Sequence, residues 1–252
     1  MIKKEILKVM SVKEIATDSY EMSLENEYIS THAVPGQFLH LSIPGHTLRR
    51  PISIASCNQM DKVVKVLFKT IGTGTKELSG YQSGEQLDGL GPIGHGFPIE
   101  DLKPNDSVLL IGGGIGIPPI YFLATALKER GIKLQFILGF QSKDFVFYEK
   151  EFNMLGETYI VTNDGSYGHR GLVTDLIPNV SSFDRYYACG PLPMLKAVKK
   201  TLAHKKGYIS FEERMGCGVG ACFACVLKTN DGIGYKKICQ DGPVFAADEV
   251  II

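Results

Sequence analysis

Four cysteines in the C-terminal part of the chain have a spacing that suits iron–sulfur chemistry. They follow the pattern C-x4-C-x2-C…C and are Cys217, Cys222, Cys225 and Cys239. This is the plant-type pattern for a [2Fe–2S] cluster, in which four thiolates hold two irons. Glycines before and between the first two cysteines would let the loop wrap closely and aim N–H groups at sulfur. Zinc sites favour two C-x2-C pairs, and only one is present, so a cluster is favoured over zinc or buried thiols. We therefore predict a one-electron carrier.

A second motif is a glycine loop between a predicted strand and a predicted helix. The apolar run from Val108 to Ile111 precedes it, and the helix continues to Arg130. The glycines, which would let a pyrophosphate approach the backbone, are Gly112, Gly113, Gly114 and Gly116. Proline stands where the G-x-G-x-x-G pattern has its third glycine. A nucleotide site is thus favoured over a tight turn, but not strongly by this loop alone.

Another stretch with the same strand-to-helix character is Cys189-Gly190-Pro191. Ligands bind at this edge of a parallel sheet, so Cys189 either lines a nicotinamide site or packs in the core. The choice between NADH and NADPH stays open. Asp144 is a poor candidate for the acidic ribose contact that NADH would need, and Ser142-Lys143 is an opposing hint towards NADPH. The turn at Asp164-Gly-Ser166 could contact the nucleotide or be only a turn.

An arginine motif nearer the N-terminus could bind a diphosphate. In Arg50-Pro51-Ile52-Ser53, a guanidinium and a hydroxyl stand three residues apart along an extended chain. Leu67-Phe68-Lys69 and the turn containing Gly74 and Thr75 follow, and the turn could make a second contact to the same anion. An ordinary basic loop is the alternative.

The elements that must position these motifs fall into three segments. Residues 1–100 form short alternating strands separated by turn residues, which predicts an antiparallel β-barrel. Residues 101–207 alternate strands with helices, which predicts a Rossmann-like parallel α/β domain. Residues 208–252 form a glycine- and cysteine-rich tail that is too small to be held together by core burial alone. We expect a multidomain β plus α/β protein.

Composition excludes several classes of protein. Lys plus Arg and Asp plus Glu both number 27, which leaves no basic excess for nucleic acid or for a polybasic membrane anchor. The segment from Val108 to Leu127 has 20 uncharged residues, but its glycines and the pair Pro118-Pro119 favour strand, loop and helix over membrane insertion. The N-terminus has no apolar core for secretion, so we expect a cytoplasmic protein whose cysteines do metal or redox work.

Taken in order, these motifs resemble the ferredoxin-reductase superfamily over essentially the whole chain. The tail, Glu212 to Cys225 with Cys239 to Phe245, is similar to that of the electron-transfer subunits of type B (NAD-dependent) dihydroorotate dehydrogenases. The resemblance implies FAD at the arginine motif, at Leu67, Phe68 and Lys69, and at Gly74 and Thr75. It also implies NAD at the glycine loop and at Cys189-Gly190-Pro191, and a [2Fe–2S] cluster on the four cysteines.

The resemblance also implies a reaction and a partner. A catalytic subunit with FMN would oxidise dihydroorotate, in a complex of two catalytic and two electron-transfer subunits. Electrons would pass through the cluster to FAD and then to NAD+ as a hydride, in pyrimidine biosynthesis. No general base for dihydroorotate is evident in this chain. His40, His95 and His169 are expected to be surface or loop residues, and Cys57 a buried small apolar residue.

Two alternatives remain open. The first is a flavin and [2Fe–2S] diaphorase subunit of a ferredoxin:NAD(P) oxidoreductase, a hydrogenase or a sulfide dehydrogenase. In the oxidoreductase an aspartate replaces one cluster cysteine, whereas this chain has cysteine at all four positions. The second is a redox-sensing protein that binds flavin and cluster without turnover, and the intact glycine loop disfavours it.

Overall fold

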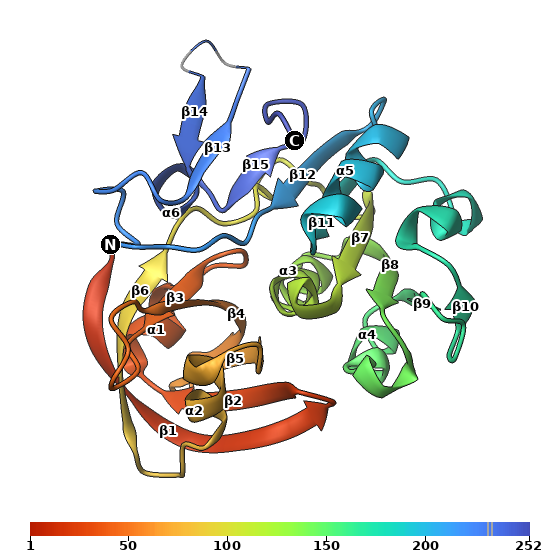
Figure 1. Cartoon of the computed structure of the whole chain (residues 1–252). Helices are drawn as coiled ribbons and strands as arrows, with labels where there is room; N and C mark the ends of the chain where they lie inside the picture. The colour runs from red at the N-terminus through yellow and green to blue at the C-terminus, as the bar shows by residue number, and fades with distance from the viewer. Residues whose placement is uncertain (231, 233) are drawn as a thin grey trace.

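The N-terminal part of the chain folds into a closed antiparallel barrel (Figure 1). The computed structural model describes residues 1–230, 232 and 234–252. The strands follow the order β1-β2-β5-β4-β3-β6 around the barrel. They are β1 (Lys3–Ala16), β2 (Ser19–Glu25), β3 (Phe38–Leu41), β4 (Arg50–Asn58), β5 (Val63–Lys69) and β6 (Gln86–Ile93), with helices α1 (Glu27–His32) and α2 (Thr73–Ser79). The predicted barrel is confirmed.

Alternation along the strands decides which side chains fill the barrel. In β3, Leu39 and Leu41 are fully buried in the barrel core, because successive side chains of a strand point to opposite faces. Phe38, on the other face, is buried in a different core that the α/β sheet and the tail share. The outer face of β3 is therefore covered by the rest of the protein rather than by solvent.

The central part of the chain forms a seven-stranded sheet of order β10-β9-β8-β7-β11-β12-β15. All of its neighbours are parallel except β12 and β15. The strands are β7 (Ser107–Gly113), β8 (Lys133–Phe140), β9 (Glu157–Thr162), β10 (His169–Arg170), β11 (Arg185–Cys189), β12 (Lys206–Ser210) and β15 (Val244–Ala246). The helices are η1 (Gly114–Gly116), α3 (Ile117–Glu129), η2 (Lys143–Phe145), α4 (Glu149–Asn153), η3 (Val173–Asn179) and α5 (Leu192–Thr201). The predicted parallel α/β architecture is confirmed.

The uncharged segment from Val108 to Leu127 becomes β7, η1 and most of α3, as its glycines and prolines predict. Within the described part of the chain, no helix combines the length and the apolar character needed to cross a bilayer.

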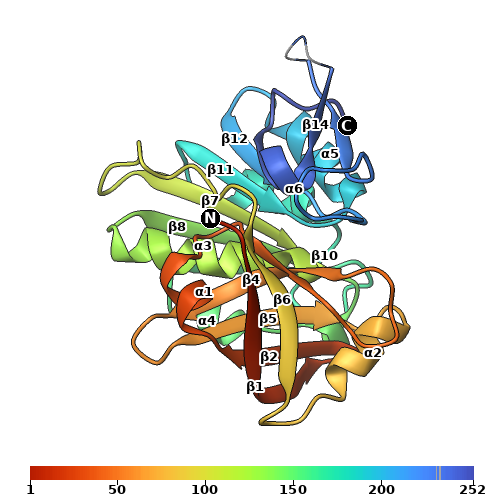
Figure 2. The same ribbon diagram turned by 90° about the vertical axis from the view of Figure 1, so that its left-hand side faces the viewer.

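The tail packs on the other two parts and does not form a core of its own (Figure 2). It contains β13 (Val226–Lys228), β14 (Tyr235–Lys237) and α6 (Ile238–Asp241) before the chain returns to the sheet as β15. Cys225 and Cys239 are buried in the same core as Ile209 of β12 and Phe245 of β15. The expected boundary at residue 207 falls inside β12, so the tail and the α/β sheet are structurally continuous.

An ion pair ties the linker between barrel and sheet to β11. The side chain of Arg185 is only 7% exposed and makes two hydrogen bonds to the carboxylate of Asp101, at 2.7 and 2.6 Å. Lys206 adds a contact of 3.0 Å to the same carboxylate. Hydrogen bonds from Arg185 and Lys206 hold the pKa of Asp101 well below its ordinary value of 3.8.

We expect Asp101→Asn to destabilise the protein at neutral pH, because it leaves the buried guanidinium of Arg185 without a charged partner. Asp101 is 55% exposed, so solvent screens the pair and the expected loss is about 1 kcal/mol. A carboxyl with a lowered folded-state pKa stabilises above its unfolded pKa and loses this effect as the pH falls. Urea unfolding at pH 7 and pH 3 should therefore show a difference that shrinks at pH 3. Glu14→Gln, at an exposed carboxylate of β1, is the control, and an equal loss there would contradict the prediction.

Candidate functional site

A pocket of about 420 Å³ beside β4 and β5 brings together most of the barrel residues that the sequence predicts to bind FAD. Antiparallel pairing places the beginning of β4 beside the end of β5, so two separate stretches of sequence meet there. The predicted residues that line the pocket are Arg50, Pro51, Ile52, Ser53, Leu67, Phe68, Lys69 and Thr75. Its aromatic walls and its cations fit a flat ring that carries an anionic chain.

Neighbouring groups hold the guanidinium of Arg50 in place. It donates to the carbonyl of Leu48 and lies 3.0 Å from Nδ1 of His46. Nε2 of His46 is in turn 3.2 Å from Glu77 of α2. Sequence reasoning missed His46 and Glu77, because only the folded chain brings a loop histidine and a helix carboxylate to this arginine.

Gly74 and Thr75 belong to this site in a different way from the one predicted. A Cβ at Gly74 would lie 2.7 Å from Nη2 of Arg50, so the glycine leaves room for the guanidinium. The hydroxyl of Thr75 already accepts hydrogen bonds from the N–H groups of Ile71 and Gly72, at 3.0 and 3.3 Å. In this structure Thr75 holds the turn, and Gly74 shapes the space for the arginine.

We expect Gly74→Ala to weaken FAD binding about tenfold without loss of stability. The new methyl group would displace the guanidinium of Arg50 from its hydrogen-bond partners, while alanine favours α2 by about 1 kcal/mol. Gly72→Ala is the matched control, because its Cβ would meet no atom within 4 Å. Flavin dissociation constants and urea unfolding of both variants test this. Equal weakening in both variants would contradict the role assigned to Gly74.

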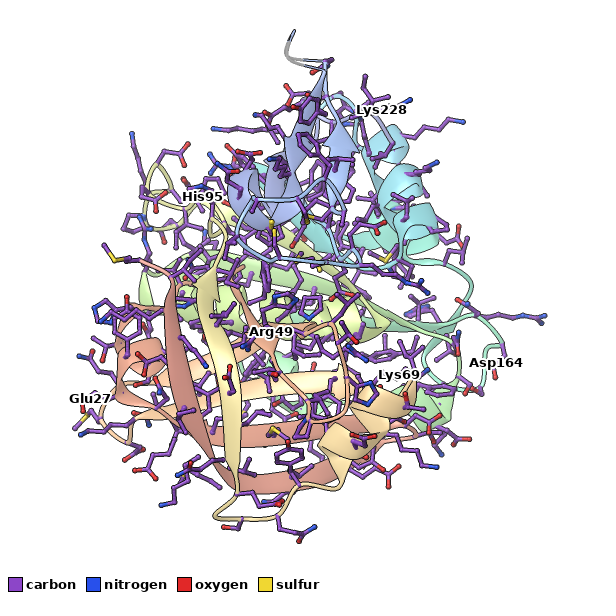
Figure 3. All side chains as sticks on the ribbon, turned by 60° about the vertical axis from the view of Figure 1, so that its left-hand side comes forward. Glu27, Arg49, Lys69, His95, Asp164 and Lys228 are labelled. Atoms are coloured by element: carbon purple, nitrogen blue, oxygen red, sulfur yellow. The ribbon has the colours of Figure 1, made fainter. Side chains whose placement is uncertain are left out.

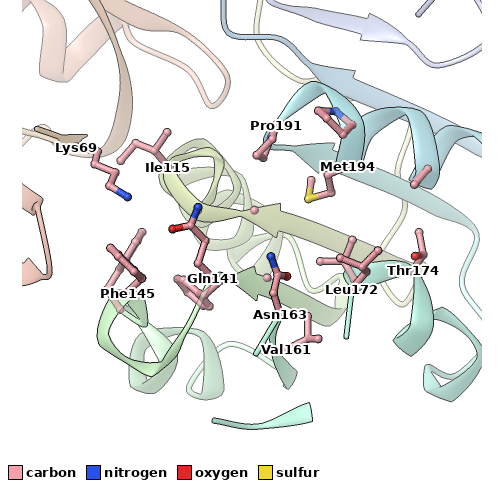
Figure 4. A pocket seen from close by; sticks show the side chains of 18 of the residues that line it. Lys69, Ile115, Gln141, Phe145, Val161, Asn163, Leu172, Thr174, Pro191 and Met194 are labelled. Atoms are coloured by element: carbon pink, nitrogen blue, oxygen red, sulfur yellow. The ribbon is translucent and has the colours of Figure 1, made fainter. Parts of the chain in front are cut away.

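A second cavity of about 420 Å³ lies at the carboxyl edge of the sheet (Figure 4). Of the residues predicted to bind NAD, Gly113, Gly114 and Pro191 line it. It also contains three polar side chains that the sequence did not single out, Gln141, Asn163 and Thr174. The cavity lies outside the carboxyl ends of parallel strands and beside the start of α3. Nucleotides bind at this position in open parallel α/β sheets.

The remaining predicted glycines lie behind the cavity and permit close packing. A Cβ at Gly112 would lie 2.7 Å from Ile117, and one at Gly116 would lie 2.4 Å from the carbonyl of Cys189. Gly190 has a φ of +159°, and a Cβ there would lie 2.5 Å from Met194. Gly116 and Gly190 allow the loop after β7 to approach the loop after β11, whereas Gly112 makes room for Ile117 at the start of α3.

The structure bears on the two interpretations that the sequence left open for Cys189 and for the turn at Asp164. Cys189 is fully buried among apolar side chains, and neither cavity has it among its described lining residues, which favours packing. Asp164, which lies on a loop at the edge of the molecule (Figure 3), accepts hydrogen bonds from the N–H and the hydroxyl of Ser166, at 3.0 and 2.7 Å. This is the geometry of a turn. Its neighbour Asn163 lines the cavity instead.

The two cavities meet. Lys69 of β5 and Ile115 of η1 line both of them. Nζ of Lys69 lies 4.3 Å from the ring centre of Phe145 and points into the space between Ile115 and Gln141 (Figure 4). A ring in the barrel pocket and a ring in the sheet cavity can therefore come into contact, which hydride transfer requires.

The four predicted ligand cysteines form two pairs. Cys217 is in side-chain contact with Cys222, and Cys225 with Cys239. Among the described residues, no three His, Cys, Asp or Glu side chains gather closely enough to hold one metal ion. Two pairs of thiols fit two irons with two cysteines each better than they fit a single zinc ion. The thiol arrangement therefore suits a [2Fe–2S] cluster.

Backbone N–H groups surround these sulfur atoms. Burial raises the pKa of Cys217, but hydrogen bonds from the N–H groups of Val219 and Cys222 outweigh it and lower the pKa to about 6. The N–H of Gly220 lies 3.2 Å from the sulfur of Cys239. Gly218 and Gly220 have φ of +71° and +78°, a conformation that favours glycine and turns the N–H groups inward. The loop therefore stabilises the thiolate form of Cys217, whereas burial raises the pKa of Cys239 to about 12 despite the N–H of Gly220.

The expectation for His40 is wrong. His40 is fully buried in β3 and is neither a surface nor a loop residue, whereas His95 and His169 are exposed. Burial, with the charges of Arg49 and Arg50, lowers the pKa of His40 to about 4. Cys57 is only partly buried.

Comparison with known proteins supports one family throughout the chain. The profile of the iron–sulfur cluster binding domain of dihydroorotate dehydrogenase B matches residues 212–251. Proteins of Bacillus cereus (strain G9842) and Lysinibacillus sphaericus (strain C3-41) are each 47% identical to this chain, with full coverage of both chains. Both are named dihydroorotate dehydrogenase B (NAD(+)), electron transfer subunit.

A solved structure of a related class has the same fold. It is the NADH-dependent reduced ferredoxin-NADP oxidoreductase, described in connection with flavin-based electron bifurcation. The TM-score is 0.88 at 29% identity, over 98% of this chain and 90% of that one. The likeness therefore extends over the barrel, the sheet and the tail.

Proposed function

We infer the function from the premise that this chain belongs to the family of electron transfer subunits of dihydroorotate dehydrogenase B (NAD(+)). It is an oxidoreductase subunit that uses FAD, a [2Fe–2S] cluster and NAD, and its complex contains a catalytic dihydroorotate dehydrogenase subunit. We propose that it passes electrons from dihydroorotate oxidation to NAD+, in pyrimidine biosynthesis.

The observation that carries this proposal is the continuity of three sites. The sheet cavity joins the barrel pocket at Lys69 and Ile115. The far side of the same pocket is lined by residues 211–215, which lead directly into the loop that begins at Cys217. A chain that only exchanged hydride between flavin and nicotinamide would need no third site.

We propose specific roles for the residues along this route. Arg50 holds the diphosphate of FAD, and the backbone at Gly113 and Gly114 holds the pyrophosphate of NAD+. The four cysteines hold the cluster. When bound, the flavin can transfer two electrons as a hydride or one electron at a time, and the cluster carries single electrons. The aromatic and apolar walls orient the rings and exclude water.

The partner is proposed to contain FMN and to assemble with this chain as two catalytic plus two electron-transfer subunits. Apolar side chains beside the thiol loop support a docking role for this end of the molecule, because Phe223 is 63% and Val219 is 48% exposed. We propose the cytoplasm as the compartment, since none of the six cysteines forms a disulfide in this structure and cysteines persist in that state there.

Anaerobic titration of the purified chain with NADH tests the proposal. We expect NADH to bleach the flavin absorbance rapidly and then to produce the electron paramagnetic resonance signal of a reduced [2Fe–2S] cluster. A chain that binds both groups but is not reduced by NADH would be a sensor or scaffold. Reduction by NADPH in preference to NADH would contradict the assignment of NAD as the co-substrate.

A further inference from the structure

His40 has a buried imidazole without a hydrogen-bond partner. Within residues 1–230, 232 and 234–252, neither Nδ1 nor Nε2 has one, although the ring is fully buried. A buried polar group without a hydrogen-bond partner destabilises the folded protein, so each such group needs an explanation. The backbone around it is firmly held, since Arg49 donates to the carbonyl of His40 at 3.2 Å and pairs with Asp88 at 2.6 Å.

The ring lies between the flavin pocket and the thiol loop. On one side, His40 is two residues from Phe38 and pairs across the sheet with Pro51, and both of these residues line the pocket. On the other side, a Cβ at Gly218 would lie 2.4 Å from Nδ1 of His40. The imidazole therefore fills the space that a side chain at 218 would occupy, next to Cys217.

We propose that His40 donates a hydrogen bond to a sulfur atom of the cluster and thereby raises the reduction potential of the cluster. The ring N–H is the only side-chain donor that the outer face of β3 brings to this loop. Hydrogen bonds to sulfur stabilise the extra electron of a reduced cluster. His40 is a tuning residue that acts through the cluster. This inference rests on the proposed function, because it requires the [2Fe–2S] cluster.

The test uses the complex with its catalytic subunit and measures the cluster potential by redox titration monitored with electron paramagnetic resonance. His40→Phe keeps a ring but removes both nitrogens, and His40→Gln keeps a donor. We expect the phenylalanine variant to disfavour cluster reduction about tenfold, which is about 59 mV for a one-electron couple. The glutamine variant should recover part of that shift. His204→Gln, at an exposed position, should leave the potential unchanged.

A measurement on the unmodified complex covers the case in which the phenylalanine variant does not fold. When all histidines are labelled with 15N, pulsed electron paramagnetic resonance of the reduced cluster should detect a coupling between the cluster spin and an imidazole 15N. This coupling should be absent from His40→Gln. A missing coupling, or an unchanged potential in His40→Phe, would overturn the proposal, as would a shift confined to the flavin. In each of these cases a cluster that NADH reduces would leave the proposed function intact.

Discussion

Replacing Cys222 by serine should abolish electron exchange with the catalytic subunit and leave most NADH–dye activity in place. Cys222 lies in the loop beside Cys217, whereas the flavin pocket and the nucleotide cavity contain neither residue among their described linings. Serine is a poor replacement for a thiolate ligand of iron, so the relay should be interrupted while hydride transfer continues. Dihydroorotate-dependent NAD+ reduction and NADH–dye reduction, measured on the same preparation, separate the two effects.

Cys57→Ser is the matched control for this prediction. The thiol of Cys57 lies on the barrel strand β4, and burial raises its pKa to about 12, so it is poorly suited to bind a metal. We expect this variant to keep both activities. If the Cys222 variant still exchanged electrons with the partner at the normal rate, the relay through this loop would be wrong.

Arg50→Ala should cause the largest loss of FAD binding among barrel variants. A guanidinium that binds a diphosphate makes charge-assisted hydrogen bonds. Their loss weakens the free energy of FAD binding by about 3 kcal/mol, which is more than a hundredfold in affinity. We expect the variant to purify largely without flavin and to lack NADH–dye activity. Flavin content and the dissociation constant for added FAD measure the effect.

The adjacent arginine serves as the control. Arg49 pairs with Asp88 at 2.6 Å and does not line the pocket, so Arg49→Ala should lower stability while retaining flavin. If Arg49→Ala lost FAD and Arg50→Ala retained it, the diphosphate assignment within the motif would have to be reversed.

Much of the architecture could be predicted because local sequence and tertiary contacts agree there. Alternating strands before residue 100, and the change to strand and helix at Val108, correspond to the barrel and the parallel sheet. The strand pairing of β4 with β5 brings the arginine motif beside Leu67, Phe68 and Lys69, as expected. The spacing of the cysteines is local as well, so the loop could be recognised directly.

The features that were missed depend on contacts between distant segments. His40 stands in the sequence Phe-Leu-His-Leu, where a polar residue at an alternate position suggests a solvent-facing side of a strand. The tail covers that face, which no local pattern reveals. Strand β15 has only three residues, so its return to the sheet beside β12 could not be predicted. The contacts of Arg50 with His46, and of His46 with Glu77, likewise exist only in the folded chain.

The most direct test is dihydroorotate-dependent reduction of NAD+ by this chain combined with its catalytic subunit. We predict turnover that requires both subunits, and loss of that turnover in Cys222→Ser with flavin still bound. Intact flavin and cluster spectra, NADH–dye activity and no transfer from dihydroorotate in the assembled complex would contradict the proposed function and would mean that the electrons come from another donor.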